Sequence, residues 1–287
     1  MFAAIFFAIS PAVAGGCPPE KLASFDITLT PEGKPIVPVV IGGHTISLKL
    51  DSGGFDSMLT ETTVRTLDLR RSVIANHTFV VGNDKITQYA TASDVSFGGR
   101  HMATLPFMIL PDGHLEAAVG GTLGPNLLRQ YGVELDFGGG KVNLFSTKAC
   151  DGSLAYWTNG PASVVPIAPW RIGPFTTQLK IDGKSFAAIV STGIEVTSMP
   201  FETAQRLGLI TDAAKLKPVP GQDGYFTYTF GSLAFENGPV IAKPDIVLIR
   251  HDQQGFDEDM VLGVDILRQF HIYIAYGAQK MFMTPAH

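Results

Sequence analysis

Residues 123–131 read Leu-Gly-Pro-Asn-Leu-Leu-Arg-Gln-Tyr, and residues 262–270 read Leu-Gly-Val-Asp-Ile-Leu-Arg-Gln-Phe. A second pair of blocks precedes these two at the same long spacing. Residues 46–53 read Ile-Ser-Leu-Lys-Leu-Asp-Ser-Gly, and residues 186–193 read Phe-Ala-Ala-Ile-Val-Ser-Thr-Gly. Two matched blocks in the same order indicate a duplicated domain, because a solenoid would need shorter and more numerous units.

The two copies differ at one position that matters for chemistry. Asp51 in the first copy is replaced by Ser191 in the second, whereas a hydroxyl residue and a glycine follow in both, as Ser52-Gly53 and Thr192-Gly193. The duplication therefore keeps the shape of the turn but only one of two ionisable side chains.

The composition favours a β-rich protein with many turns. With 287 residues the chain is long enough for two lobes of roughly 130 residues, each with its own core. Charged residues make up 16% of the chain, which also holds 31 Gly and 19 Pro, as expected for short strands joined by turns. The net charge is -5 and Lys and Arg form no run, so a nucleic-acid partner is not expected.

The N-terminal residues 1–14 are apolar and end in Ala12-Val13-Ala14, a small-x-small pattern typical of signal-peptide cleavage. We interpret them as a secretory signal, although basic residues are missing from its start; the alternative is an apolar tail on a cytosolic protein. The stretch is too short to span a bilayer, and no membrane span is expected elsewhere. The expected location is therefore periplasmic or secreted.

The two cysteines, Cys17 and Cys150, allow three interpretations. In an oxidising compartment they can form a disulfide that pins the mature N-terminus to the boundary between the repeats. Alternatively, Cys17 carries a lipid anchor, although no Leu lies three residues before it. The third interpretation is two unpaired thiols.

Each repeat opens with strand-like stretches that lead into the glycine block. Gly42-Gly43 and Asp182-Gly183 are hairpin-turn signals just before the two blocks. Short helices are expected over 61–67 and 200–207, with Pro200 at the first helical position, and over 126–130 and 265–269. The expected organisation is a lobe over 15–150, a polar linker over 151–163 and a second lobe over 164–287.

The order of these elements resembles that of retropepsin-like aspartic proteases, the pepsin and retroviral type. The resembling features are a strand, Asp-Ser/Thr-Gly, a hairpin-rich stretch, and then Leu-Gly-x-Asn/Asp before a closing strand; residues 121–128 are especially similar to the retroviral form. The resemblance covers nearly all of the chain after residue 14. It implies an all-β fold with minor helix, in which two pseudo-symmetric acid-protease-like β-barrel lobes meet at a cleft.

The resemblance also implies roles for individual residues. Asp51 is the catalytic carboxylate, and Ser52 and Thr192 tie the two lobes together by hydrogen bonds. Gly53 and Gly193 permit the turns. Gly124 and Gly263 lie where the closing segment packs beneath the active-site loop and leaves no room for a side chain.

Ser191 departs from the family pattern. The family's chemistry uses two carboxylates that share one proton, because two negative charges about 3 Å apart cannot both be tolerated. A serine hydroxyl can position a water but cannot take over the acid or base role, so Ser191 is a degenerate second catalytic position. Glu195 is the nearest acid, but the Arg that pairs with such an acid in retroviral proteases is replaced here by Val264.

Other sites are less well defined by the sequence. Gly82 and Gly224, with Tyr225 beside the latter, are candidates for flap tips over a substrate groove, although ordinary hairpin turns explain them equally well. The histidines are scattered without ligand spacing, so we expect no metal site, and no cofactor motif is present.

The sequence thus favours an exported aspartic endopeptidase that acts on extended polypeptide as a monomer, with Asp51 as the surviving catalytic group. The alternative is an inactive pseudoprotease that binds peptides or assists assembly in the periplasm. Retention of Asp51 and the glycines favours the first, and Ser191 favours the second.

Overall fold

The structure is a computed structural model, and it describes residues 20–75, 79–82, 84–147, 155–169, 173–250 and 259–286. Four short α-helices accompany the strands, and they are α1 (Glu61–Thr66), α2 (Pro125–Leu128), α3 (Phe201–Arg206) and α4 (Val264–Leu267). The strands of the first half are β1 (Lys21–Asp26), β2 (Thr28–Leu29), β3 (Pro35–Ile41), β4 (His44–Leu50), β5 (Met58–Thr60), β6 (Arg70–Val73), β7 (Phe79–Val81), β8 (Asp84–Ile86), β9 (Gln88–Phe97), β10 (Arg100–Leu110), β11 (Gly121–Leu123), β12 (Gly132–Asp136) and β13 (Lys141–Phe145). Those of the second half are β14 (Ser163–Pro166), β15 (Ala168–Pro169), β16 (Phe175–Ile181), β17 (Lys184–Val190), β18 (Ser198–Pro200), β19 (Lys217–Pro218), β20 (Tyr225–Thr229), β21 (Ser232–Phe235), β22 (Val240–Ala242), β23 (Asp245–Ile249), β24 (Met260–Leu262), β25 (Phe270–Ala275) and β26 (Lys280–Pro285).

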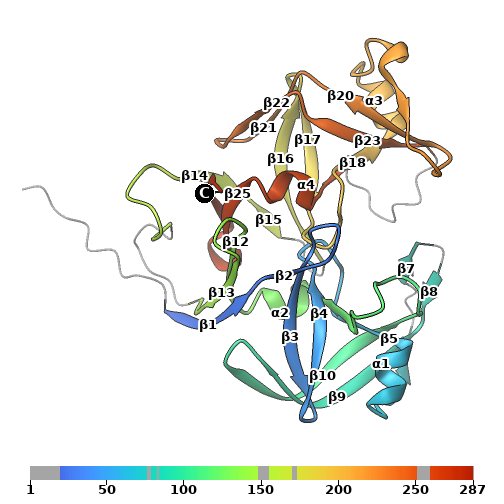
Figure 1. Cartoon of the computed structure of the whole chain (residues 1–287), viewed down its shortest axis with the longest axis vertical. Helices are drawn as coiled ribbons and strands as arrows, with labels where there is room; N and C mark the ends of the chain where they lie inside the picture. The colour runs from blue at the N-terminus through green and yellow to red at the C-terminus, as the bar shows by residue number, and fades with distance from the viewer. Residues whose placement is uncertain are drawn as a thin grey trace, which may run out of the picture.

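Two large sheets form the bodies of two lobes, one below and one above in the view of Figure 1. In the N-terminal lobe, β4 pairs in parallel with β11, which pairs antiparallel with β5, which pairs in parallel with β10. In the C-terminal lobe, β17, β24, β18 and β23 repeat that pattern of parallel and antiparallel pairs. The expected fold class is confirmed: the protein is all-β with minor helix and has two pseudo-symmetric lobes of the acid-protease-like type.

A third sheet joins the halves. Its six strands run in the order β1-β13-β12-β25-β26-β14, three from each half, and they lie beside the two lobes in Figure 1. The halves meet where β12 pairs antiparallel with β25, from Gly132 opposite Ala275 to Asp136 opposite His271. This shared sheet holds the lobes together independently of the cleft.

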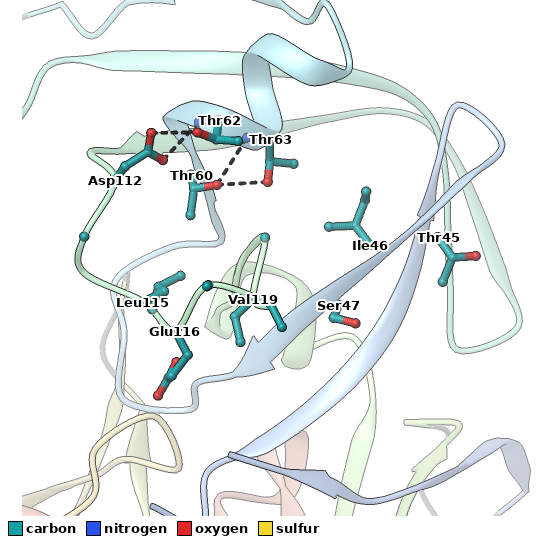
Figure 2. Close-up of a pocket in the computed structure, with 14 residues that line it drawn as sticks. Thr45, Ile46, Ser47, Thr60, Thr62, Thr63, Asp112, Leu115, Glu116 and Val119 are labelled. Atoms are coloured by element: carbon teal, nitrogen blue, oxygen red, sulfur yellow. Dashed lines mark hydrogen bonds between the residues drawn. The ribbon is translucent and has the colours of Figure 1, made fainter. Parts of the chain in front are cut away.

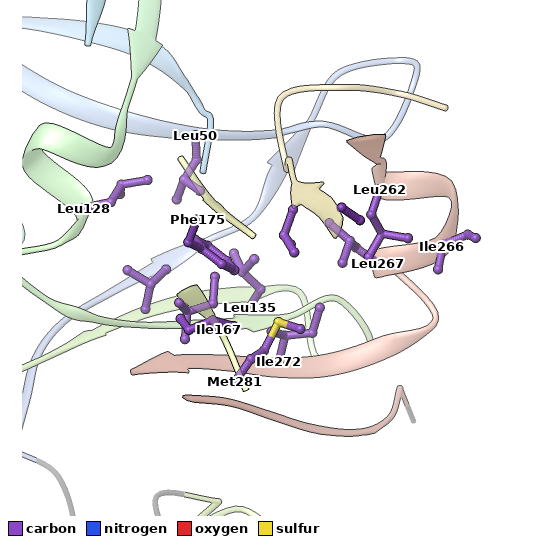
Figure 3. Close-up of a cluster of buried hydrophobic side chains, with 14 of the residues drawn as sticks. Leu50, Leu128, Leu135, Ile167, Phe175, Leu262, Ile266, Leu267, Ile272 and Met281 are labelled. Atoms are coloured by element: carbon purple, nitrogen blue, oxygen red, sulfur yellow. The ribbon is translucent and has the colours of Figure 1, made fainter. Parts of the chain in front are cut away.

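The main hydrophobic core is continuous across both lobes. Alternation along the strands builds it: in β3 and β16, side chains that point inward are buried and those between them are more exposed. Figure 3 shows where the halves meet, with Leu50 from β4, Phe175 from β16, and Ile272 and Met281 from the shared sheet. The active-site loops therefore rest on packed strands from both halves.

The predicted hairpins form as expected. Gly42-Gly43 and Asp182-Gly183 connect β3 to β4 and β16 to β17, and all four residues have φ between 48° and 82°, the left-handed region that such turns require. The expected helices are present. The expectation for Pro200 was wrong: it is the N-cap residue of α3, and Phe201 begins the helix.

The described part of the linker, residues 155–163, packs against the rest of the protein. Ala155 is buried and Trp157 stacks on His271 of β25 with ring centroids 4.2 Å apart, so the linker covers the outer face of the shared sheet. Residues 1–14, Cys17 and Cys150 lie outside the described residues. Among the described helices, none has the length and apolar character needed to cross a membrane.

Candidate active site

Two matched loops meet between the lobes, one after β4 and one after β17. The backbone N–H of Asp51 donates to the Leu123 carbonyl at 2.9 Å, and that of Ser191 donates to the Leu262 carbonyl at 3.0 Å. The parallel pairs β4–β11 and β17–β24 thus present residues 51 and 191 at equivalent ends of their strands.

The structure brings the two side chains together. The Ser191 hydroxyl donates to Asp51 Oδ1 at 3.1 Å, and the Gly53 N–H donates to the same oxygen at 3.0 Å. The Gly193 N–H donates to Ser191 Oγ at 3.3 Å, so each side chain is oriented by the glycine two residues on. The site therefore pairs one carboxylate with one hydroxyl.

The tie between the loops consists of four hydrogen bonds. The Ser52 hydroxyl donates to the Val190 carbonyl at 2.7 Å, and the Thr192 hydroxyl donates to the Leu50 carbonyl at 2.7 Å. Each hydroxyl also accepts from the backbone N–H of the other residue, at 3.1 Å and 3.2 Å. Because Ser52 and Thr192 are fully buried, water does not compete with these bonds.

The glycines of the two loops are needed for space. A Cβ at Gly53 would lie 2.3 Å from Ser191 Cβ, and one at Gly193 would lie 2.3 Å from Asp51 Cγ. Either contact is far shorter than packed atoms tolerate. Any side chain at these positions would therefore push residues 51 and 191 apart.

The second block supports the loops from beneath. A Cβ at Gly124 would lie 2.5 Å from the Asp56 backbone carbonyl group, and one at Gly263 would lie 2.7 Å from the Val196 backbone. The N–H of Gly124 donates to Ser57 Oγ at 2.9 Å, and that of Gly263 donates to Thr197 Oγ1 at 3.0 Å.

Two further side chains complete this support, and sequence reasoning missed their role. The Ser57 hydroxyl donates to Asn126 Oδ1, and the Thr197 hydroxyl donates to Asp265 Oδ1, both at 2.7 Å. Asn126 and Asp265 occupy the same position of the repeated block. Their shared position in the repeat is the sequence signal that could have identified this supporting role.

A cavity of about 230 Å³ opens above the two loops. Asp51 and Ser191 lie on its wall together with mostly apolar residues, which are Phe55, Met58, Val80, Val81, Ile189, Ile194 and Val261. Gly82, which has φ of 57°, lines the cavity directly after β7, at the turn into β8.

Gly224 and Tyr225 are not among the residues that line this cavity. Gly224 accepts from the Arg250 N–H at 2.8 Å, at the end of the antiparallel pair β20–β23. They form part of an ordinary hairpin, which was the alternative interpretation. Of the two candidate flap tips, Gly82 lines the cavity and Gly224 does not.

Asp56 lies beside the cleft and was not singled out from the sequence. It lines a neighbouring cavity of about 400 Å³ with Phe55, Phe79, Tyr89 and Met108 among its apolar and aromatic walls. Burial raises the pKa of the Asp56 carboxyl to about 6, although the Ser57 N–H bond works in the opposite direction. A single residue without a repeated partner gave no signal in the sequence.

A larger cavity of about 470 Å³ lies in the N-terminal lobe and does not include Asp51 or Ser191 (Figure 2). Its polar groups pair with one another: Asp112 accepts from the N–H and hydroxyl of Thr62 at 3.0 Å and 2.7 Å, and Thr60 caps α1. Within the described residues, no three His, Cys, Asp or Glu side chains gather as a metal site requires. The cleft between the lobes is therefore the candidate site.

Two lobes that meet at a shared sheet, each contributing a strand-end loop to one cleft, define the acid-protease-like fold. Residues 37–128 match the family model described as aspartyl protease, a range that includes Asp51 but less than half of the chain. No curated protein sequence matches the chain.

Among solved structures, the chain is similar to the crystal structure of basic 7S globulin from soybean. The TM-score is 0.54 and the sequence identity 10%, over 94% of this chain and 96% of that chain. At this identity the likeness shows the fold alone. The family match supports a peptidase-like function, and the structural likeness supports the two-lobed fold.

Proposed function

We propose that the protein is an exported aspartic-type endopeptidase that hydrolyses extended polypeptide with Asp51 as its only catalytic carboxylate. The observation that carries the proposal is the hydrogen bond of 3.1 Å between Ser191 Oγ and Asp51 Oδ1 in a cleft whose loops are fixed across the lobes. Gly53 and Gly193 leave the space that allows these two side chains to meet.

In the proposed reaction, a water molecule lies between Asp51 and Ser191. Ionised Asp51 removes a proton as the water oxygen bonds to the substrate carbonyl carbon. Protonated Asp51 then gives that proton to the amide nitrogen, and the carbon–nitrogen bond breaks to yield an acid and an amine. The Ser191 hydroxyl, which now donates to Asp51, can donate instead to the oxyanion that forms.

The cleft favours an extended chain with apolar side chains. The Ile189, Val261 and Met58 side chains give the cavity an apolar wall next to the two reacting positions. The β7–β8 hairpin above them offers backbone N–H and C=O groups to an added strand, the usual way that a groove of this kind holds peptide. Selectivity would then come from apolar pockets.

A second function is favoured by one observation. Because position 191 holds a hydroxyl, the site has no second acid, and a missing acid–base partner typically costs a factor of 10² to 10⁴ in rate. A protein that binds peptides in the same cleft without cleaving them would show the same geometry. We infer that the endopeptidase is the better supported of the two, because residues 37–128, which include Asp51, match the aspartyl protease family model.

The test is incubation of purified protein with a diverse peptide mixture from pH 3 to 7, with products identified by mass spectrometry. We expect cleavage that is lost in Asp51→Asn. Asp245→Asn, which removes a carboxylate from an exposed strand end in the C-terminal lobe, is the control and should cleave normally. Peptide binding without Asp51-dependent cleavage would leave the binding function in its place.

A further inference from the structure

Lys49 is a charged residue in an unusual place. It lies in β4 two residues before Asp51, and only 8% of its surface is exposed. The matching position of the second copy is Ile189, which is fully buried and apolar. A buried ammonium is costly unless something compensates for the lost hydration, so the cation at this one position of the first copy requires a reason.

The Lys49 ammonium reaches across the cleft floor to the other lobe. Its Nζ donates to the Gly193 carbonyl at 3.1 Å, in the loop that holds Ser191. The four hydrogen bonds between the Ser52 and Thr192 loops form two matched pairs, one bond of each pair from each copy. The Lys49 bond has no such counterpart, because Ile189 at the matching position has no side-chain donor. Both charged groups therefore belong to the first copy, the Asp51 carboxylate and the Lys49 ammonium, and the second copy has uncharged residues at the matching positions.

We propose that Lys49 is a positioning residue that fixes the Gly193 loop and supplies the counter-charge for Asp51 in a site that has lost its second carboxylate. In a paired site, the shared proton keeps the two carboxylates at a single negative charge. Here the Lys49 ammonium supplies positive charge near the lone carboxylate in place of a shared proton. The inference rests on the proposed function only in treating Asp51 as the catalytic group, because the charge pairing holds equally for a peptide-binding protein.

The charges around Lys49 are consistent with this role. Burial lowers the pKa of the Lys49 ammonium below its ordinary value, and the charge of Asp51 is the strongest influence in the opposite direction. The other charged groups that act on it are Lys34 and Glu32, from the segment that joins β2 to β3, and Glu116, from the segment that joins β10 to β11. Lys34 is committed elsewhere, since its Nζ lies 2.7 Å from Glu116 and 3.5 Å from Glu32.

A double-mutant cycle tests the pairing without relying on activity. Lys49→Gln removes the charge and keeps an N–H donor, and Asp51→Asn removes the partner's charge at nearly constant shape. Either change alone leaves one charge buried and unpaired, which destabilises more than removal of both. In urea unfolding at pH 7, we expect the double variant to have an unfolding equilibrium constant at least tenfold smaller than the two single variants predict together.

The pH dependence separates charge pairing from a packing role. The non-additivity should shrink toward zero at pH 3, where carboxylates are protonated, while the hydrogen bond to Gly193 would be unaffected. Lys34→Met combined with Asp51→Asn is the matched control and should be additive. If Lys49→Gln does not fold, Lys49→Met, which removes the charge and keeps the length of the side chain, takes its place and should show the same coupling to Asp51→Asn.

Additive effects of Lys49→Gln and Asp51→Asn at pH 7 would overturn the proposal whether or not the protein cleaves peptides. Conversely, a protein that shows the coupling but no Asp51-dependent cleavage would retain the pairing and lose only the proposed endopeptidase function.

Discussion

At the scale of single residues, Asp56 carries a carboxyl group whose surroundings oppose its charge. Its pKa is about 6 in the folded protein against an ordinary value of 3.8, because the group is partly buried beside an apolar cavity. The folded state thus binds the proton more tightly than the unfolded chain, and stability falls as pH rises from about 4 to about 6.

Asp56→Asn should remove this loss of stability between about pH 4 and about pH 6. A shift of about two pH units corresponds to at most about 3 kcal/mol, so we expect the variant to be more stable than the wild type at pH 7 by up to that amount, and to differ little at pH 3.5. Urea unfolding at both pH values measures it. If Asp56→Asn is equally destabilised at both pH values, the contacts of Asp56 stabilise the folded protein, and burial of its charge does not destabilise it.

The Thr192 hydroxyl gives a second prediction at this scale. Thr192→Val removes its bonds to the Leu50 carbonyl and from the Ser52 N–H, both buried, and should lower the free energy of unfolding by about 2 kcal/mol. It should also lower any Asp51-dependent activity or peptide affinity. Thr177→Val, which removes a bond of 2.8 Å to the Pro166 carbonyl within the C-terminal half, is the control. It should cost stability and leave the cleft unaffected; equal effects of both on the cleft would contradict the role of the tie.

Residues with a counterpart in the repeat could be predicted, and residues without one could not. The pairing of Ser52 with Thr192 and the proximity of Asp51 to Ser191 are visible because each has a partner at the same position of the other copy. Lys49 and Asp56 matter through burial and through charges from distant segments, which no spacing along the chain reveals.

At the scale of elements, the β7–β8 hairpin is the candidate flap, and one side-chain pair connects it to the rest of the lobe. His114 Nε2 lies 2.7 Å from Asp84 Oδ2, which connects β8 to the segment between β10 and β11. His114→Ala should release this contact and speed hydrogen exchange of the β7 and β8 amides several-fold, while exchange in β4 stays unchanged.

The control is His101→Ala, which removes a similarly exposed pair in which His101 Nδ1 lies 3.3 Å from Asp94 Oδ1 at the far end of the β9–β10 hairpin. It should not alter exchange in β7 or β8. Faster exchange in both variants would mean that the hairpin responds to charge in general and not to this anchor.

Connection length explains why the sequence could not decide between a flap tip and an ordinary hairpin turn at Gly224. Between β6 and β9 the chain makes an excursion long enough to form β7 and β8, whereas between β19 and β20 the Val219 N–H bonds directly back to the Tyr225 carbonyl at 2.9 Å. Each region contains a glycine that marks a turn, Gly82 or Gly224, so the sequence predicts a turn in both regions but does not predict whether the turn reaches over the cleft. The hairpin turns at Gly42-Gly43 and Asp182-Gly183 were predictable because their conformation is encoded by two adjacent residues.

At the scale of the whole molecule, a buried charged cluster joins the halves in the shared sheet. Glu134 of β12 is almost fully buried and accepts from His271 of β25 at 2.7 Å, from Tyr156 at 2.6 Å and from Asn143 at 2.7 Å. Burial alone would raise the pKa of Glu134, but these bonds lower it below its ordinary value of 4.5.

The stability that Glu134 contributes is therefore fully present above pH 4.5 and is lost as pH falls through the lower, folded-state value. Glu134→Gln should cost about 3 kcal/mol at pH 7, because it replaces a buried carboxylate that accepts three hydrogen bonds by a neutral amide that accepts weaker ones, and the cost should shrink in acid. Asp26→Asn, which breaks an exposed ion pair with Lys141 at the edge of the same sheet, should change stability little. A pH-independent cost in Glu134→Gln would contradict the charged role; urea unfolding decides.

The duplication predicts two lobes and the floor of the cleft, because each copy builds its own strand-end loop. It does not predict that strands from both halves complete one sheet. That arrangement depends on β12 and β25 meeting in register and on Trp157 stacking on His271, contacts between segments far apart along the chain.

The central claim is that Ser191 occupies the position of the second carboxylate of a catalytic pair, and Ser191→Asp tests it most directly. The change places a second carboxylate opposite Asp51 in a loop already shaped by Thr192 and Gly193, so we expect proteolysis to rise strongly, with a bell-shaped dependence on acidic pH because two coupled titrations bound the active form. The activity of the wild type, which has one carboxylate, should not show a bell-shaped pH dependence. Unchanged activity in a folded Ser191→Asp variant that still requires Asp51 would contradict the claim and place any second catalytic group elsewhere.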